Sequence, residues 1–182
     1  MTSPLDPYRA HAIAYTDAVV DLCREPSIRR RLESGRGRPV AEGGARMHRH
    51  LAALVEGHPG HRAHFTVASL IARHRPAPAP ASPQEPPPWF ERPDLGRSYA
   101  DAVHRAQLNP GPTADRLERL VRFGTDLLHL SLGSEINRLH SAGVTPDWAV
   151  LLEDLRQWPW RGPQVTERWL EHFYLRTAAP HA

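Results

Sequence analysis

A proline-rich stretch in the middle of the chain places the strongest limit on its fold. Seven prolines lie between residues 76 and 88, interleaved with alanine. Proline has no backbone N–H and clashes with the preceding helical turn, so this stretch cannot form the interior of a helix. Alternating Pro and Ala favours the extended polyproline II conformation, in which thirteen residues span roughly 40 Å. We therefore expect a semi-rigid linker at 76–93; a ligand for a proline-recognition domain is the alternative.

Both segments beside this linker have the sequence pattern of helices. Period-2 alternation typical of strands is nearly absent, and the Gly, Pro, Ser and Thr positions are typical of helix ends. Ser27, Thr113, Thr125 and Thr145 are expected as N-caps. The expected helices cover 7–23, 28–33, 45–55 and 60–73, then 95–107, 114–124, 126–141, 146–158 and 163–177. The sequence predicts an all-α fold of two small helical bundles, at 1–75 and 94–182, joined by the proline-rich linker.

The distribution of positive charge indicates a polyanionic partner. The chain has 23 arginines and no lysine, and eight of the arginines lie between residues 24 and 49 beside only three acidic residues. Residues 1–75 carry 12 arginines against 7 acidic residues, whereas the remainder carries 11 against 13. A compositional preference explains arginine over lysine but not this clustering. Because the guanidinium fork binds phosphate bidentately and stacks on bases, the cluster predicts contact with a nucleic-acid backbone.

Signals of other protein classes are few. Cys23 is the single cysteine, which excludes an internal disulfide and a cysteine metal cluster; we expect it to pack as a small hydrophobe. Apolar runs such as 148–152 are too short to span a bilayer, so no membrane association is expected. Asp6 and Asp17 interrupt any signal-peptide pattern, so a cytoplasmic protein is expected. The chain lacks a nucleophile elbow, a Walker loop and a dinucleotide fingerprint, and we predict no catalytic activity and no cofactor.

Two alternatives of other classes remain open at this point. His58, His61 and His64 are spaced by three, and a helix could bring two of them onto one face to serve a metal-dependent helical enzyme. A zinc site usually needs a third protein ligand and an oriented second shell, so exposed histidines are the simpler interpretation. The other alternative is a helical transcription regulator, although no short turn joins two helices with an evident recognition helix.

The C-terminal third contains an ordered pattern that resembles a known family. Residues 147–158 (DWAVLLEDLRQW) precede Arg168-Trp169 and Phe173-Tyr174, and this order is similar to the CasB family, the small subunit of the type I-E CRISPR Cascade complex. Three earlier segments are similar in the same order: Arg30-Arg31-Leu32 leading to Gly37-Arg38-Pro39, Leu95-Gly96-Arg97-Ser98, and Arg116-Leu117 with Leu120-Val121. The resemblance covers most of the chain outside the linker.

This resemblance implies a non-catalytic, all-helical subunit that works inside a guide-RNA ribonucleoprotein. It implies partners in the backbone and large subunits of Cascade, a second copy of itself, and opened target DNA, above all the displaced strand. The family often has arginines in the middle of the 126–141 helix, where this chain has Ser131 and Gly133, so that helix is a weaker candidate for DNA contact here. Each candidate arginine could instead serve solubility or pair within its helix. The predicted contacts are Arg29, Arg30, Arg31, Arg36, Arg38, Arg46, Arg49, Arg97, Arg116 and Arg161.

Overall fold

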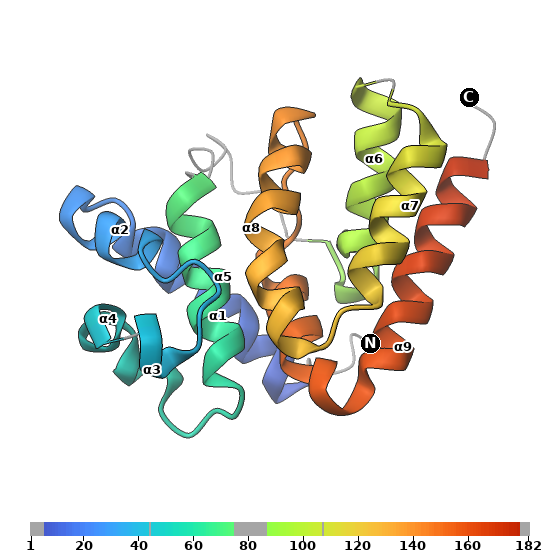
Figure 1. Ribbon diagram of the computed structural model, residues 1–182. Coiled ribbons are helices and arrows are strands. Elements are labelled where there is room, and N and C mark those ends of the chain that lie inside the picture. Colours follow the sequence, from blue (N-terminus) through green and yellow to red (C-terminus); the bar gives the residue numbers. More distant parts are fainter. Residues whose placement is uncertain (1–5, 44, 75–86, 107, 179–182) are drawn as a thin grey trace.

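The computed structural model describes residues 6–43, 45–74, 87–106 and 108–178, and every regular element within these ranges is a helix (Figure 1). The all-α prediction is confirmed. The helices are α1 (Pro7–Leu22), α2 (Pro26–Glu33), α3 (Val40–Gly43), α4 (Ala45–Val55), α5 (His61–His74), the 3-10 helix η1 (Trp89–Glu91), α6 (Leu95–Ala106), α7 (Pro110–Val121), α8 (Thr125–Ser141) and α9 (Trp148–Ala178). Most of the predicted linker lies outside the described residues, so the linker and the domain boundaries stay predictions.

Helix α5 forms the centre of the N-terminal part. Its residues from Ala63 to Ala72 are all buried, and it packs against α1, α2, α4, α8 and α9. The Tyr15 hydroxyl of α1 donates a hydrogen bond to the backbone carbonyl of His64 at 2.9 Å. Buried residues on both sides of the proline-rich stretch belong to one continuous hydrophobic cluster. The described helices of the two predicted bundles therefore share a core.

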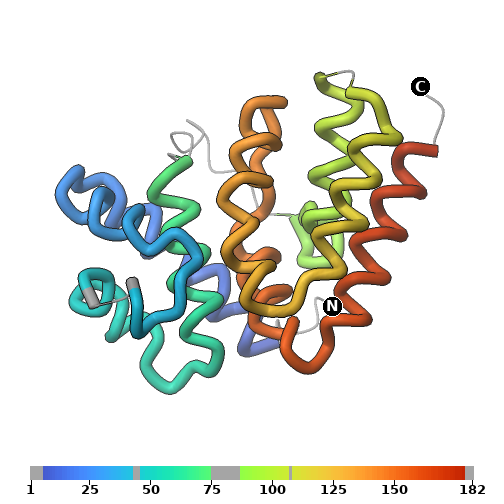
Figure 2. The backbone as a smooth tube through the Cα atoms, in the orientation of Figure 1, coloured from blue at the N-terminus to red at the C-terminus, as the bar shows by residue number. Residues whose placement is uncertain are grey.

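Helix α9 is bent sharply in the middle. Asp147 caps its start, because the carboxylate accepts hydrogen bonds from the backbone N–H groups of Ala149 and Val150 at 3.0 and 3.1 Å. At Arg161 the backbone leaves the helical region, with φ −126° and ψ 21°. Pro159 and Pro163 flank this position, and proline disrupts the helical hydrogen bonds on either side. The break predicted between 158 and 163 is therefore present, and Figure 2 shows the backbone turning back there.

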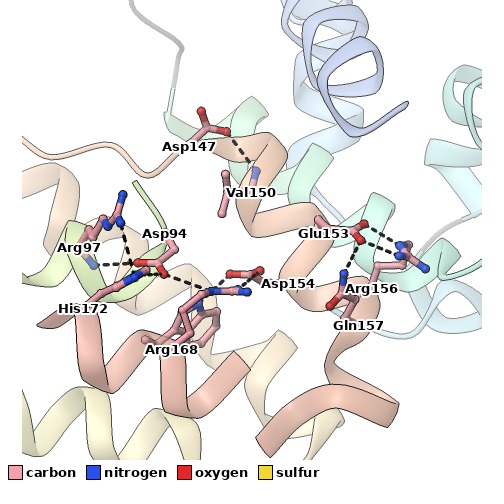
Figure 3. Close-up of polar contacts among 11 residues, drawn as sticks. Asp94, Arg97, Asp147, Val150, Glu153, Asp154, Arg156, Gln157, Arg168 and His172 are labelled. Carbon is pink, nitrogen blue, oxygen red and sulfur yellow. Dashed lines mark hydrogen bonds and ion pairs between the residues drawn. The ribbon is translucent and has the colours of Figure 1, made fainter. Parts of the chain in front are cut away.

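A buried polar network holds the two halves of α9 together (Figure 3). Asp94 and Asp154 are only 3% and 4% exposed. Arg168 bridges them, with its Nε 3.4 Å from Asp94 Oδ2 and its other end paired with Asp154. The Trp169 indole N–H also donates to Asp154 at 2.7 Å, and His172 Nδ1 lies 2.6 Å from Asp94. Burial raises the pKa of Asp154 to about 6, and Arg168 opposes that shift.

The neighbouring acids Glu153 and Asp154 have different partners. Arg156 donates to both carboxylate oxygens of Glu153, at 2.7 and 2.6 Å. Both acids are buried, with exposed fractions of 6% and 4%. Asp154 pairs across the bend with Arg168, fourteen residues further along the chain.

The predicted N-caps are wrong by a few residues. Proline at a first helical position fixes where a helix begins, and Pro26 and Pro110 hold that position in α2 and α7. Ser27 and Thr113 consequently lie inside these helices, and Thr113 donates to the backbone carbonyl of Asn109. The residues at the N-cap positions of α2, α7, α8 and α9 are Glu25, Asn109, Gly124 and Asp147. No helix in the described ranges is long and apolar enough to cross a membrane.

Three buried histidines have pKa values well below the ordinary 6.5. Burial lowers the pKa of His64, His74 and His129 to about 4. Their exposed fractions are 0%, 7% and 2%. The expectation of exposed histidines is therefore wrong for His64. These side chains are neutral in the fold at pH 6, where an unfolded chain would protonate them.

Helices α6 and α9 approach backbone to backbone at a glycine. A Cβ atom added to Gly96 would lie 1.9 Å from the carbonyl oxygen of Trp169, so no side chain fits there. Gly133, inside α8, has open space around the same position, with no atom within 4 Å. The packing of α6 on α9 thus requires glycine at position 96, whereas packing does not require it at position 133.

We expect Gly96→Ala to lower the free energy of unfolding by about 3 kcal/mol, because the backbones of α6 and α9 must separate. Gly133→Ala, the matched control, should raise it by about 0.5–1 kcal/mol, since alanine is the better helix former. Urea unfolding followed by circular dichroism measures both. Equal effects of the two substitutions would contradict the close approach.

The histidines predict that stability falls as the pH drops from 6.5 towards 4. In that interval the unfolded chain binds protons that the native chain does not, which costs about 1.4 kcal/mol per pH unit for each fully titrating histidine. Asp154 acts in the opposite direction, because its raised pKa keeps it protonated in the native chain below about pH 6. Because three histidines lower the stability in this pH range and one aspartate raises it, the net effect is a loss of stability. His129→Gln should remove about one proton from the pH dependence of the free energy of unfolding, whereas the exposed control His61→Gln should leave that pH dependence unchanged.

Candidate nucleic-acid interface

Helix α2 carries three of the predicted arginines. Leu32 is completely buried and anchors the helix against α5. Arg30 and Arg31 are exposed and Arg29 is half-buried. The sequence places these residues around the one apolar position of the turn, so burying Leu32 directs the charged neighbours towards solvent.

The loop between α2 and α3 is pressed against α8. Gly37 has φ +69°, and a Cβ there would lie 2.1 Å from the carbonyl oxygen of His129. Only glycine allows so close an approach. Arg36 also has a left-handed backbone, with φ 47°. Arg36 and Arg38 are exposed on this loop, so the contact at Gly37 fixes two arginines beside α8.

Helix α4 completes this end of the molecule. Met47 and Leu51 are buried in the core, whereas Arg46 and Arg49 are exposed. Helices α2 and α4 are in contact, and Arg31 Nη1 lies 3.4 Å from His50 Nε2. Figure 1 shows α2, α3 and α4 together at one end, on the far side of α5 from α6 and α7.

None of these seven arginines has a carboxylate within ion-pair distance among the described residues. We call this set the basic face: Arg29, Arg30, Arg31, Arg36, Arg38, Arg46 and Arg49. Eight other arginines do pair with carboxylates: Arg24, Arg62, Arg92, Arg122, Arg138, Arg156, Arg168 and Arg176. The ion pairs among the described residues thus involve other arginines and leave those of the basic face without a carboxylate partner.

A cavity of about 240 Å³ adjoins the basic face between α5 and α8. Arg36 and Arg73 line it together with Glu33, Ser134 and Asn137. Arg73 is exposed, and sequence reasoning missed it as a site residue. It lies in the last turn of α5, and only the packing of α5 against the loop brings it close to Arg36.

The other three predicted arginines lie elsewhere. Arg97 of α6 donates to the backbone carbonyl of Phe90 at 3.0 Å and lies 3.5 Å from His172 Nε2, so its guanidinium is already engaged. Arg116 of α7 is half-buried and lines a pocket of about 200 Å³. Arg161 is exposed at the bend of α9. The structure does not bring these three together with the basic face, and their contact with nucleic acid stays a prediction.

The histidines proposed for a metal site are arranged by packing. His64 is buried, with its Nδ1 3.0 Å from the carbonyl oxygen of Gly60 and its Nε2 3.0 Å from His11 Nε2. His58 stacks on His11 at a ring distance of 3.3 Å. Within the described part of the chain, no three His, Cys, Asp or Glu side chains are placed to hold a metal ion.

Comparison with known proteins gives consistent matches along nearly the whole chain. Residues 27–174 match the family described as CRISPR-associated protein Cse2. A chain of a CRISPR RNA-guided surveillance complex is 29% identical, with a TM-score of 0.77 over 93% of this chain and 95% of that one. A chain of a pre-nicking CRISPR RNA-guided surveillance complex is 30% identical, with a TM-score of 0.81 over 93% and 94%. No curated protein sequence gives a significant match.

Proposed function

Since the chain belongs to the Cse2 family, the CasB small subunits of type I-E Cascade, we propose that it holds opened DNA inside the surveillance complex. In this role it is a structural subunit without catalysis. Its arginines contact the sugar–phosphate backbone, with the displaced single strand as the main ligand. The observation that carries the proposal is the basic face, whose seven guanidinium groups have no carboxylate partner among the described residues.

The energetics of strand opening make such contacts sufficient. The guide–target duplex is about as stable as the DNA duplex that it replaces, so modest contacts with the backbone decide how far opening proceeds. A positively charged surface can follow a single strand without reading its sequence. Phosphate contacts position the strand, whereas base contacts would be needed for specificity. A non-catalytic clamp needs no more than this.

The proposed partners are the backbone and large subunits of Cascade and a second copy of the chain. Leu127 and Leu130 of α8 support contact with a protein, since they are 57% and 48% exposed. Exposed leucines that lie one turn apart on a helix offer an apolar surface of the kind found at protein interfaces. The family match favours this assembly over the helix-turn-helix regulator.

Neutralising part of the basic face should weaken binding and flatten its salt dependence. Each phosphate contact to a single strand contributes about 0.7 to the slope of log affinity against log salt concentration. We expect Arg30→Gln, Arg31→Gln and Arg38→Gln together to reduce that slope by about 2. Fluorescence anisotropy of the full chain with a labelled single-stranded oligonucleotide, titrated at several salt concentrations, measures the effect.

The matched control removes the same charge from paired arginines. Arg24, Arg122 and Arg176 are exposed, and each pairs with a carboxylate. Their combined change to glutamine should leave the slope nearly unchanged. If both triple variants behave alike, only net charge matters, and the basic face is not the interface.

A further inference from the structure

A second cationic site lies at the bend of α9, apart from the basic face. A cavity of about 380 Å³ opens there between α1, η1 and the two halves of α9. The bend at Arg161 creates it, because the second half of α9 turns back beside the first. Its lining includes Arg9, Trp89, Glu153, Asp154, Arg161, Gln164 and Arg168.

The carboxylates in this cavity already have basic partners. Glu153 accepts two hydrogen bonds from Arg156, and Asp154 accepts from Arg168 and from the indole of Trp169. Arg9 and Arg161 also line the cavity and have no carboxylate partner in the described ranges. The cavity therefore presents two guanidinium groups without an ion pair, which suits an anion.

Trp89 in the cavity lies beside a guanidinium group, and two more aromatic rings lie beside Arg156, outside the cavity lining. The Arg9 guanidinium carbon lies 5.2 Å from the centre of the Trp89 ring. The corresponding carbon of Arg156 lies 4.3 Å from the Tyr8 ring and 5.5 Å from the Trp160 ring. Tyr8 and Trp160 are 44% and 56% exposed, although aromatic side chains of this size are usually well buried. Exposed aromatic rings beside arginines form the stacking platforms that bind unpaired bases.

We propose that this cavity receives one nucleotide of a single-stranded nucleic acid. Arg9 and Arg161 bind its phosphate, and the base enters the cavity against Trp89. Gln164, which has no hydrogen-bond partner among the described residues, is available to the edge of the base. The proposal rests on the nucleic-acid contact proposed above and adds a base-binding site to a surface that otherwise binds phosphates.

The size and chemistry of the cavity favour a nucleotide over other anions. Its volume lies within the roughly 300–1,000 Å³ typical of small-molecule sites, which is far more than a lone ion needs. An acidic peptide would satisfy Arg9 and Arg161 but would leave the aromatic rings unused. A nucleotide uses both.

The test compares two oligonucleotides of equal length, an oligothymidylate and its abasic counterpart, each titrated against the full chain by fluorescence anisotropy. Both carry the same phosphates, so only base contacts separate their affinities. We expect the oligothymidylate to bind about tenfold more tightly, as one stacked base provides. Trp89→Ala should bring the ratio of affinities close to one, and the conservative Trp89→Phe should preserve it. The triple variant of Arg30, Arg31 and Arg38 should weaken both ligands and preserve the ratio.

Each failure has its own signature. Equal binding of the two oligonucleotides to the wild-type chain, or a ratio unchanged by Trp89→Ala, would overturn the base site while leaving the basic face intact. Binding of neither would overturn the proposed function itself. If Trp89→Ala does not fold, Gln164→Ala replaces it, because Gln164 is exposed and is placed at the edge of the base, and an unchanged ratio there is equally decisive. If an oligoglutamate binds the triple variant as tightly as the oligothymidylate does, the cavity is a peptide site instead.

Discussion

The shared pairing of Arg168 with two buried carboxylates is the interaction on which the C-terminal part depends. Asp94 lies at the start of α6 and Asp154 in the first half of α9, while Arg168 belongs to the second half. One guanidinium therefore joins three segments. Removing one partner of such a buried group leaves an uncompensated charge, which is costly. This arrangement holds the second half of α9 beside the first, across the bend at Arg161.

The distribution of ion pairs is the basis for both proposed binding surfaces. Acidic residues pair with particular arginines inside the fold and at its surface. Asp94 and Asp154 share a single arginine, Arg168. The arginines of α2, the 35–39 loop and α4 find no acid in the described structure, and neither do Arg9 and Arg161 at the bend. Two surfaces thus remain positive, one open and one concave. The open face suits a phosphate chain, whereas the concave one has the shape and rings for a base.

Local sequence patterns predicted the helices well, because helix formation depends on neighbours in the chain. The helix at 45–55 has its predicted bounds, and the break near Arg161 follows from two prolines. Pairings between distant residues were out of reach. The burial of Asp154 depends on Arg168, and the engagement of Arg97 depends on the carbonyl of Phe90 and on a histidine that only tertiary packing brings close. The cavity at the bend forms where α1 and η1 pack against α9, so no single stretch of sequence predicts it.

The most direct measurement is a structure of the assembled surveillance complex with opened target DNA. The account predicts that guanidinium groups of α2, the 35–39 loop and α4 lie within hydrogen-bonding distance of phosphates of the displaced strand. A structure in which this end of the chain faces solvent or another protein, while the strand runs elsewhere, would contradict it.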